Sequence, residues 1–166
     1  MVVILGGTGQ VPEPGDSDFI GPLTRADNHF INGDGIGQKK RGVLGAHNLD
    51  NFNKTLESTG FSLNDLKVGE PIPHPTIDGI YTQKYRVPAY DGRGEFIGFK
   101  NIPDPKTYYD PNVISNSQML KWGWEAMEKG DINGRYVTGV SSNGLEFRGY
   151  YDNGKITNFF PKLPEE

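Results

Sequence analysis

Glycine and proline interrupt this chain at short intervals, which limits the length of any helix or strand that it can form. There are 23 glycines and 12 prolines among 166 residues, and only 34% of the residues are hydrophobic. Proline disrupts the interior of a helix and of a central strand, and glycine favours turns. A chain of this length still fits one domain with a real core. We therefore expect an α+β fold built from short elements rather than a helical bundle.

Hydrophobic spacing and turn residues predict where these short elements lie. Leu49, Phe52 and Leu56 recur at helical spacing after Asn48, a residue type that favours the N-cap of a helix. Two Asn-Gly pairs near the C-terminal end are a strong hairpin signal. We predict helices at residues 48–59 and 115–129, strands at residues 79–87 and 95–100, and a three-stranded meander at residues 135–140, 145–151 and 155–160.

The proline-rich residues 69–75 predict a boundary, because X-Pro pairs favour rigid, extended backbone. We expect an irregular leader over residues 1–24 and a single domain over residues 25–166, with parts at about 25–68 and 76–166. The first residues lack the basic region and long apolar stretch of a signal peptide, and no apolar run approaches the ~20 residues of a membrane span. We expect a piece of a larger protein, without stable membrane insertion.

The stretch DNHFINGDGIGQKKRGVLGAHNLDNF, residues 27–52, places two of the three histidines on either side of a glycine-rich, basic connector. The apolar residues beside His29 and His47 predict that both side chains project from the ends of strands joined by the loop 32–42. Two neighbouring imidazoles can take a proton with one ring and give a proton with the other near neutral pH. This pair of transfers is what cleavage of RNA through its own 2′-hydroxyl requires.

Three other interpretations of the histidines stay open at this point. They are unrelated structural residues, or they belong to a non-catalytic binding module of a secreted protein, or they hold a metal ion. A zinc site usually draws further ligands from Cys, His or a carboxylate, but the chain has no cysteine and His74 lies in the extended segment PIPHPT. No metal is therefore expected, although a metal-dependent nuclease using His47 with Asp50 and Asp34 remains the alternative enzyme.

The charge of the chain argues mildly against a general nucleic-acid-binding protein. Its net charge is −4, whereas such proteins usually carry a positive field. The basic cluster Lys39, Lys40 and Arg41 nevertheless lies inside the connector between the two histidines. An acidic body with a local positive patch limits indiscriminate binding of polyanions. We expect these three residues either to contact RNA phosphates or to be ordinary solvated surface.

Three segments of the chain, taken in order, resemble motifs of the EndoU endoribonucleases. NHF-ING…GVLGAHNLDNF resembles the paired histidine motifs of this family, PDPKTYYDPNVIS resembles the lysine motif of its bacterial branch, and GKITNFFPKL resembles its C-terminal strand. The similarity runs from about residue 27 to the end. The resemblance implies the EndoU-like (barnase/EndoU/colicin/RelE-type) fold, with an N-terminal helical and strand part and a C-terminal antiparallel sheet packed by a helix.

The resemblance also implies a set of catalytic residues. It puts His29 and His47 in the acid–base pair and Lys106, rather than the nearby Lys100, as the third member. The implied reaction is attack of the ribose 2′-hydroxyl on the adjacent phosphorus, without a cofactor, to leave a 2′,3′-cyclic phosphate. Lys106 would stabilise charge on the phosphoryl oxygens. Which histidine is the acid and which the base is not defined by the sequence.

The substrate-binding residues implied by the resemblance depart from the family pattern. The family commonly has a tyrosine before the final proline, where its ring stacks on the ribose or base; this chain has Phe160. Phenylalanine keeps the stacking surface but lacks the hydroxyl. Asn158, with Thr157 beside it, stands where many relatives have threonine. Preference for uridine is therefore not expected to carry over unchanged.

The resemblance further implies partners and a location. Bacterial members of the family are typically C-terminal toxin domains of large secreted proteins, including contact-dependent growth inhibition systems, and a cognate immunity protein inhibits them in the producing cell. We expect an RNA substrate, with transfer RNA the foremost, and delivery at the cell surface as part of a larger protein that acts in the cytoplasm of the target cell.

Overall fold

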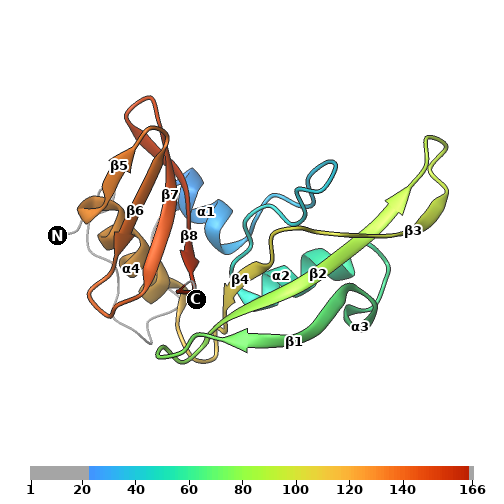
Figure 1. Ribbon diagram of the computed structural model, residues 1–166, viewed down its shortest axis with the longest axis horizontal. Coiled ribbons are helices and arrows are strands. Elements are labelled where there is room, and N and C mark those ends of the chain that lie inside the picture. The colour runs from blue at the N-terminus through green and yellow to red at the C-terminus, as the bar shows by residue number, and fades with distance from the viewer. Residues whose placement is uncertain (1–22, 165–166) are drawn as a thin grey trace.

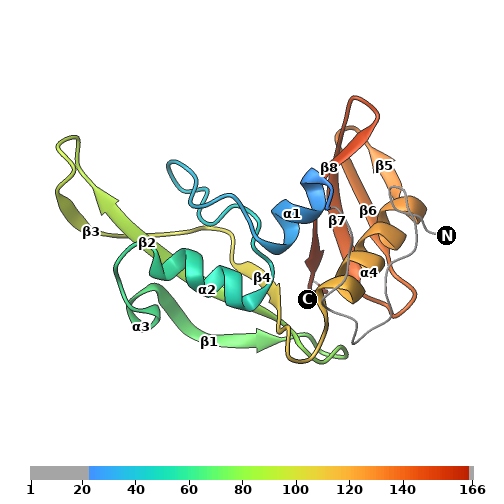
Figure 2. The same cartoon turned by 180° about the vertical axis from the view of Figure 1, so that it is seen from behind.

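Figure 1 shows the computed structural model of the chain, in which residues 23–164 are described. This part of the chain forms two four-stranded antiparallel sheets that lie side by side, with helices packed on each (Figures 1 and 2). The α+β class is thus confirmed. Residues 1–22 of the expected leader lie outside the described residues.

The first sheet is organised around one long strand, β2 (Ile80–Tyr90). It pairs antiparallel with β1 (Lys67–Pro73), β3 (Phe96–Asn101) and β4 (Lys106–Tyr109). Helices α2 (Leu49–Glu57) and α3 (Leu63–Leu66) accompany this sheet. A core of buried side chains, including Phe52, Leu56, Leu66, Tyr85 and Tyr108, lies between them.

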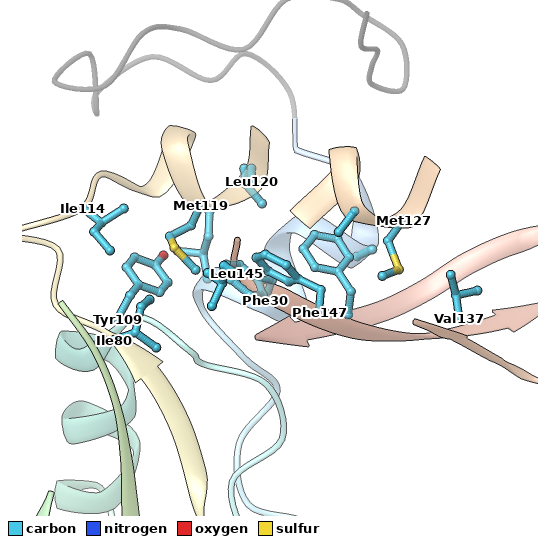
Figure 3. Close-up of a cluster of buried hydrophobic side chains, with 14 residues drawn as sticks. Phe30, Ile80, Tyr109, Ile114, Met119, Leu120, Met127, Val137, Leu145 and Phe147 are labelled. Atoms are coloured by element: carbon cyan, nitrogen blue, oxygen red, sulfur yellow. The ribbon is translucent and has the colours of Figure 1, made fainter. Parts of the chain in front are cut away.

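The second sheet follows the chain in simple order. Its strands are β5 (Asp131–Asn133), β6 (Tyr136–Val140), β7 (Glu146–Asp152) and β8 (Lys155–Lys162), each paired with the next. Helix α4 (Asn116–Lys129) packs on one face, where the buried side chains of Phe147 and Met127 meet (Figure 3). Helix α4 approaches β6 closely at Gly139, because glycine has no Cβ. A Cβ at this position would clash with the carbonyl of Ala126 on α4.

Helix α1 (Arg25–Ile31) joins the two sheets. Thr24 and Asp27 form a reciprocal capping box at its start, and Asp27 also accepts a hydrogen bond of 2.7 Å from the indole of Trp124 on α4. The ring of Phe30 stacks on Phe159 of β8 at 5.1 Å and on Tyr109 of β4 at 5.7 Å. This aromatic contact connects the last strand of each sheet.

Most of the predicted elements are confirmed, and their ends agree within a few residues. Asn48 and Ser115 cap α2 and α4 as N-caps, with side-chain oxygens that accept backbone N–H bonds. The meander corresponds to β6, β7 and β8, and the predicted strands at 79–87 and 95–100 are β2 and β3. Elements α1, α3, β1 and β5 were not predicted as separate elements, whereas the short apolar strand expected to begin at Lys106 is β4.

The prediction of a connector at residues 69–75 is wrong, because most of these residues belong to β1, which pairs with β2. Prolines are tolerated there because β1 is an edge strand that needs hydrogen bonds on one side only. The two layers therefore do not follow the expected division of the chain. The first sheet continues to Tyr109, while α1, from the N-terminal part, packs on β8.

Candidate functional site

The backbone of His47 is held at the junction of the two sheets. Its N–H donates to the carbonyl of Phe30 at 2.7 Å, and its carbonyl accepts from the N–H of Tyr109 at 2.8 Å. The preceding residues Gly45 and Ala46 have φ angles of 69° and 56°, which turn the chain sharply before α2 begins. The expected strand end at His47 is thus a strained turn between α1, β4 and α2.

The ring of His47 is buried, with 7% of the residue exposed, and lies between two aromatic rings. Phe30 stacks on it at 5.3 Å and Phe160 at 6.0 Å. Its Nδ1 lies 2.6 Å from the carbonyl oxygen of Thr107. Since a carbonyl can only accept, Nδ1 carries the proton, and the neutral ring keeps a lone pair on Nε2.

Burial lowers the pKa of His47 well below its ordinary value of 6.5, and the neighbouring charge of Lys106 lowers this pKa further. The hydrogen bond to Thr107 acts in the opposite direction, and the charge of His29 lowers the pKa again. His47 is therefore neutral at pH 7. Both Lys106 and His29 are thus close enough to His47 for their charges to affect its pKa.

His29 lies in the last turn of helix α1, not at the end of a strand as expected. The Thr24–Asp27 capping box starts this helix four residues before the histidine. Its Nδ1 lies 2.5 Å from the carboxylate of Asp34, and 20% of its side chain is exposed. Because a carboxylate accepts, Nδ1 carries a proton here too, and Asp34 fixes the orientation of the ring. The sequence pattern indicated Asp34 only as a metal ligand and did not reveal this role.

Lys106 is the first residue of β4 and is buried, with 7% of the residue exposed. Its ammonium donates to the carbonyls of Val43 at 2.9 Å and Gly45 at 2.6 Å, on the segment that leads into His47. A lysine ammonium has three N–H donors, so one remains for another acceptor. Burial lowers the pKa of Lys106 to about 7. Lys100 lies elsewhere, on β3 opposite Val87.

Replacing Lys106 by methionine is expected to change how stability depends on pH. The unfolded lysine keeps a pKa near 10.5, while the folded one has a pKa of about 7, so between these values the unfolded chain binds the extra proton. The free energy of unfolding therefore rises as pH increases from 7 toward 10, by at most about 1.4 kcal/mol per pH unit. Lys106→Met removes this rise.

Urea unfolding at pH 7, 8 and 9 measures the effect, with Lys100→Met as the matched control. The control keeps the slope of the wild-type protein. Equal slopes for all three proteins would mean that Lys106 is not buried as an ionisable group.

The three expected substrate-binding residues of the last strand lie on β8. Phe160 is half-buried and stacks on His47. Asn158 is half-buried and its side-chain oxygen has no hydrogen-bond partner, whereas Thr157 is exposed and lies on the other face of the strand. The structure therefore brings Phe160 to His47, with Asn158 on the same face of the sheet.

The basic cluster of Lys39, Lys40 and Arg41 is exposed at the tip of a small hairpin. The hairpin is closed by an Ile36–Val43 bridge and a hydrogen bond of 2.7 Å from the N–H of Gly37 to the carbonyl of Gly42. In Figure 1 it projects beyond the C-terminal end of α1. The histidines lie at the base of this hairpin, so the cluster is not placed directly beside them.

The alternative metal-ligand set is not assembled in residues 23–164. Asp34 contacts His29 rather than His47, and Asp50 is an exposed residue in the first turn of α2. Within these residues there is no group of three or more His, Cys, Asp or Glu side chains placed to hold a metal ion. Nor does any helix in this range combine the length and apolarity needed to cross a membrane.

The structure thus contains a buried neutral imidazole bonded through Nδ1 to Thr107, a second imidazole paired with a carboxylate, and a buried lysine side chain bonded to the segment before His47. The model of the bacterial EndoU nuclease family matches residues 23–163. The chain belongs to this family, and it is therefore an endoribonuclease of the EndoU class. The resemblance drawn from the three motifs is confirmed, and the non-catalytic binding module is set aside.

Two curated relatives are similar to this chain. It is 34% identical over 153 residues to the tRNA nuclease CdiA of Escherichia coli strain STEC_O31. The aligned residues make up 86% of this chain and 4% of that protein. It is 32% identical over 141 residues to the tRNA nuclease CdiA of Yersinia mollaretii, covering 80% of this chain and 4% of that protein. The chain spans about 4% of the length of these relatives.

Proposed function

We propose that this endoribonuclease cleaves RNA by transesterification through the 2′-hydroxyl, without a metal ion, and leaves a 2′,3′-cyclic phosphate. The observation that carries the proposal is the contrast between the two imidazoles. His47 is buried and neutral, with its pKa lowered, and His29 is paired with the carboxylate of Asp34. Histidines in such different surroundings suit the opposite tasks of base and acid.

His47 acts as the general base in this mechanism. Its Nδ1–H donates to Thr107, so Nε2 accepts the proton of the ribose 2′-hydroxyl. The 2′-oxygen then forms a bond to the adjacent phosphorus, and the bond from phosphorus to the 5′-oxygen breaks. The products are a 2′,3′-cyclic phosphate on one fragment and a 5′-hydroxyl on the other.

His29 acts as the general acid and gives its Nε2 proton to the departing 5′-oxygen. The carboxylate of Asp34 orients the ring, as the aspartate of a catalytic triad does for its histidine.

Lys106 and Phe160 complete the site. The third N–H of Lys106 donates to a phosphoryl oxygen as negative charge develops there, a contribution often worth about 3–4 kcal/mol. Its two bonds to the carbonyls of Val43 and Gly45 also hold the segment before His47 in place. Phe160 stacks on the base or ribose at the cleaved bond, with Asn158 as a contact to the base and Lys39, Lys40 and Arg41 as phosphate contacts. Thr157 has no part in this proposal, because it lies on the other face of β8.

The substrate that we propose is transfer RNA, because both curated relatives are named tRNA nucleases. Recognition of such a folded RNA relies on exposed loop bases and phosphate contacts. We further propose that the chain has the EndoU-type fold and is the C-terminal toxin domain of a larger protein, delivered from the cell surface into the target cytoplasm. A cognate immunity protein inhibits it in the producing cell.

Mapping the new 3′ ends of total RNA after brief exposure to the pure chain in excess chelator tests the reaction and its substrate. The expected result is cleavage at defined positions, predominantly in tRNA, with 2′,3′-cyclic phosphate ends. Phosphatase sensitivity before and after mild acid treatment identifies these ends. Cleavage that appears only after a divalent metal is added would contradict the proposed mechanism and favour the metal-dependent alternative.

A further inference from the structure

The second sheet carries a continuous row of aromatic rings on the face opposite α4. Tyr136 and Tyr150 are direct partners across β6 and β7, with ring centroids 5.4 Å apart. Tyr150 contacts Phe160 of β8 at 6.3 Å, and Phe160 stacks on His47 at 6.0 Å. The row therefore begins at the catalytic imidazole and crosses three strands to reach Tyr136.

Among residues 23–164, no helix packs on the face of the sheet that carries this row. Residues that alternate with the row, such as Phe147 and Phe159, are fully buried against the helices. The row residues become more exposed with distance from the site, from half-buried Phe160 and Tyr150 to Tyr136, which is 49% exposed. Single-stranded RNA is commonly bound in this way, by bases that stack on aromatic side chains of an open sheet face.

Two unsatisfied polar groups lie on the same face. The guanidinium of Arg148 lies 5.8 Å from the ring centroid of Tyr136, and its Nε–H is buried without a hydrogen-bond partner. The side-chain oxygen of Asn158, which pairs in register with Tyr150, is likewise buried and unpaired. Buried polar groups are normally hydrogen-bonded, so these two atoms, each closed to solvent, leave a donor and an acceptor unsatisfied on the face that carries the rings.

We propose that this face, formed by Tyr136, Arg148 and Tyr150, binds RNA next to the cleaved bond. The nucleotides that it binds are those that leave the catalytic site past Phe160. Successive bases stack on Tyr150 and Tyr136, and Arg148 contacts the phosphate that links them. The inference rests on the proposed function, which places the cleaved bond at His47. Continuity of the rings with the catalytic site and the charge of Arg148 favour a single strand of RNA as the occupant.

Binding of fluorescent 2′-O-methyl RNA tests this surface without cleavage, because the oligonucleotide has no 2′-hydroxyl to attack. Fluorescence anisotropy gives the Kd of a hexanucleotide and of a dinucleotide. Tyr136→Ala and Tyr150→Ala are each expected to weaken binding of the hexanucleotide by about 5- to 150-fold, the range for loss of one stacked base. The dinucleotide, which does not extend to Tyr136, loses less with Tyr136→Ala. Arg148→Met lowers the salt dependence of hexanucleotide binding by about one phosphate contact.

Tyr90→Ala is the matched control, since Tyr90 is 51% exposed but lies on β2 of the other sheet. It is expected to bind the hexanucleotide like the wild-type protein, and Tyr136→Phe is expected to restore most of the affinity that Tyr136→Ala loses. Unchanged hexanucleotide binding in both tyrosine-to-alanine variants would overturn the inference, and so would a wild-type protein that does not bind the hexanucleotide.

The outcome separates the surface from the catalytic proposal. A protein that cleaves RNA, with both variants still binding normally, keeps the proposed function and loses the aromatic surface. A protein that leaves RNA intact, with both variants weakened, loses the proposed function and keeps the surface as an RNA-binding site.

Discussion

Replacement of His47 by alanine is expected to lower the rate of RNA cleavage by about 10²- to 10⁴-fold, the usual contribution of a general base. The imidazole is the group whose Nε2 lone pair is left free by the bond to Thr107, and alanine offers no substitute. Initial rates on a purified tRNA substrate, measured by gel electrophoresis at pH 7, check the prediction. Cells that express the chain should correspondingly tolerate His47→Ala far better than the wild type.

His74→Ala is the control for this experiment, because it removes the third histidine of the chain, which is also buried. Its ring accepts hydrogen bonds from the backbone N–H groups of Thr76 and Ile77 in a turn after β1. It is expected to lower stability somewhat but to keep the cleavage rate of the folded protein. A folded His47→Ala protein with a rate within tenfold of the wild type would refute the role of this histidine.

A modified substrate distinguishes the acid from the base. RNA with sulfur in place of the bridging 5′-oxygen has a leaving group that departs without protonation. His29→Ala should recover most of its activity on this substrate, because only the general acid becomes dispensable. His47→Ala should stay inactive on it. The opposite pattern would exchange the two roles.

Gly45→Ala is expected to lower the free energy of unfolding by about 2–5 kcal/mol and to remove most of the cleavage activity. A Cβ at Gly45 would clash with the carbonyl of His29, and the φ angle of 69° is unfavourable for alanine. The left-handed backbone costs about 1–2 kcal/mol and the overpacking about 1–3 kcal/mol. Relief of the clash moves α1 away from the turn before His47, and a small misplacement of catalytic groups is enough to slow the reaction about 10²-fold.

Gly35→Ala separates the clash from the backbone strain. Gly35 has a φ angle of 83°, but a Cβ added there would have no other atom within 4 Å. It is expected to lose only the smaller, conformational part of the stability and to stay active. Denaturant unfolding and cleavage rates of both variants provide the test. Equal losses in the two proteins would show that contact with His29 is not what requires glycine at position 45.

The elements predicted best from the sequence carry strong local signals. Helix α4 has Ser115 at its N-cap and Gly130 after its last residue, and the C-terminal hairpins contain Asn-Gly turns. Helix α1 was not predicted because seven residues hold too little hydrophobic periodicity, and His29 was consequently assigned to a strand. Strand β1 was mistaken for a connector because its prolines are compatible with both an edge strand and a linker.

The sequence identified residues of the candidate site, but it did not predict the contacts that surround them. The resemblance to EndoU motifs named His29, His47 and Lys106, while their protonation depends on contacts between distant segments. Thr107, which fixes the tautomer of His47, is 60 residues away in the chain. The carbonyls of Val43 and Gly45 that receive the ammonium of Lys106 are equally remote from it. Such contacts arise only when the segment before α2 packs against β4, and no local pattern in the sequence indicates them.

The ring of His47 lies between Phe30, near the start of the described fold, and Phe160, in its last strand. The surroundings of the imidazole are therefore complete only when both α1 and β8 are docked beside it, so a truncation at either end of the domain should change the environment of His47.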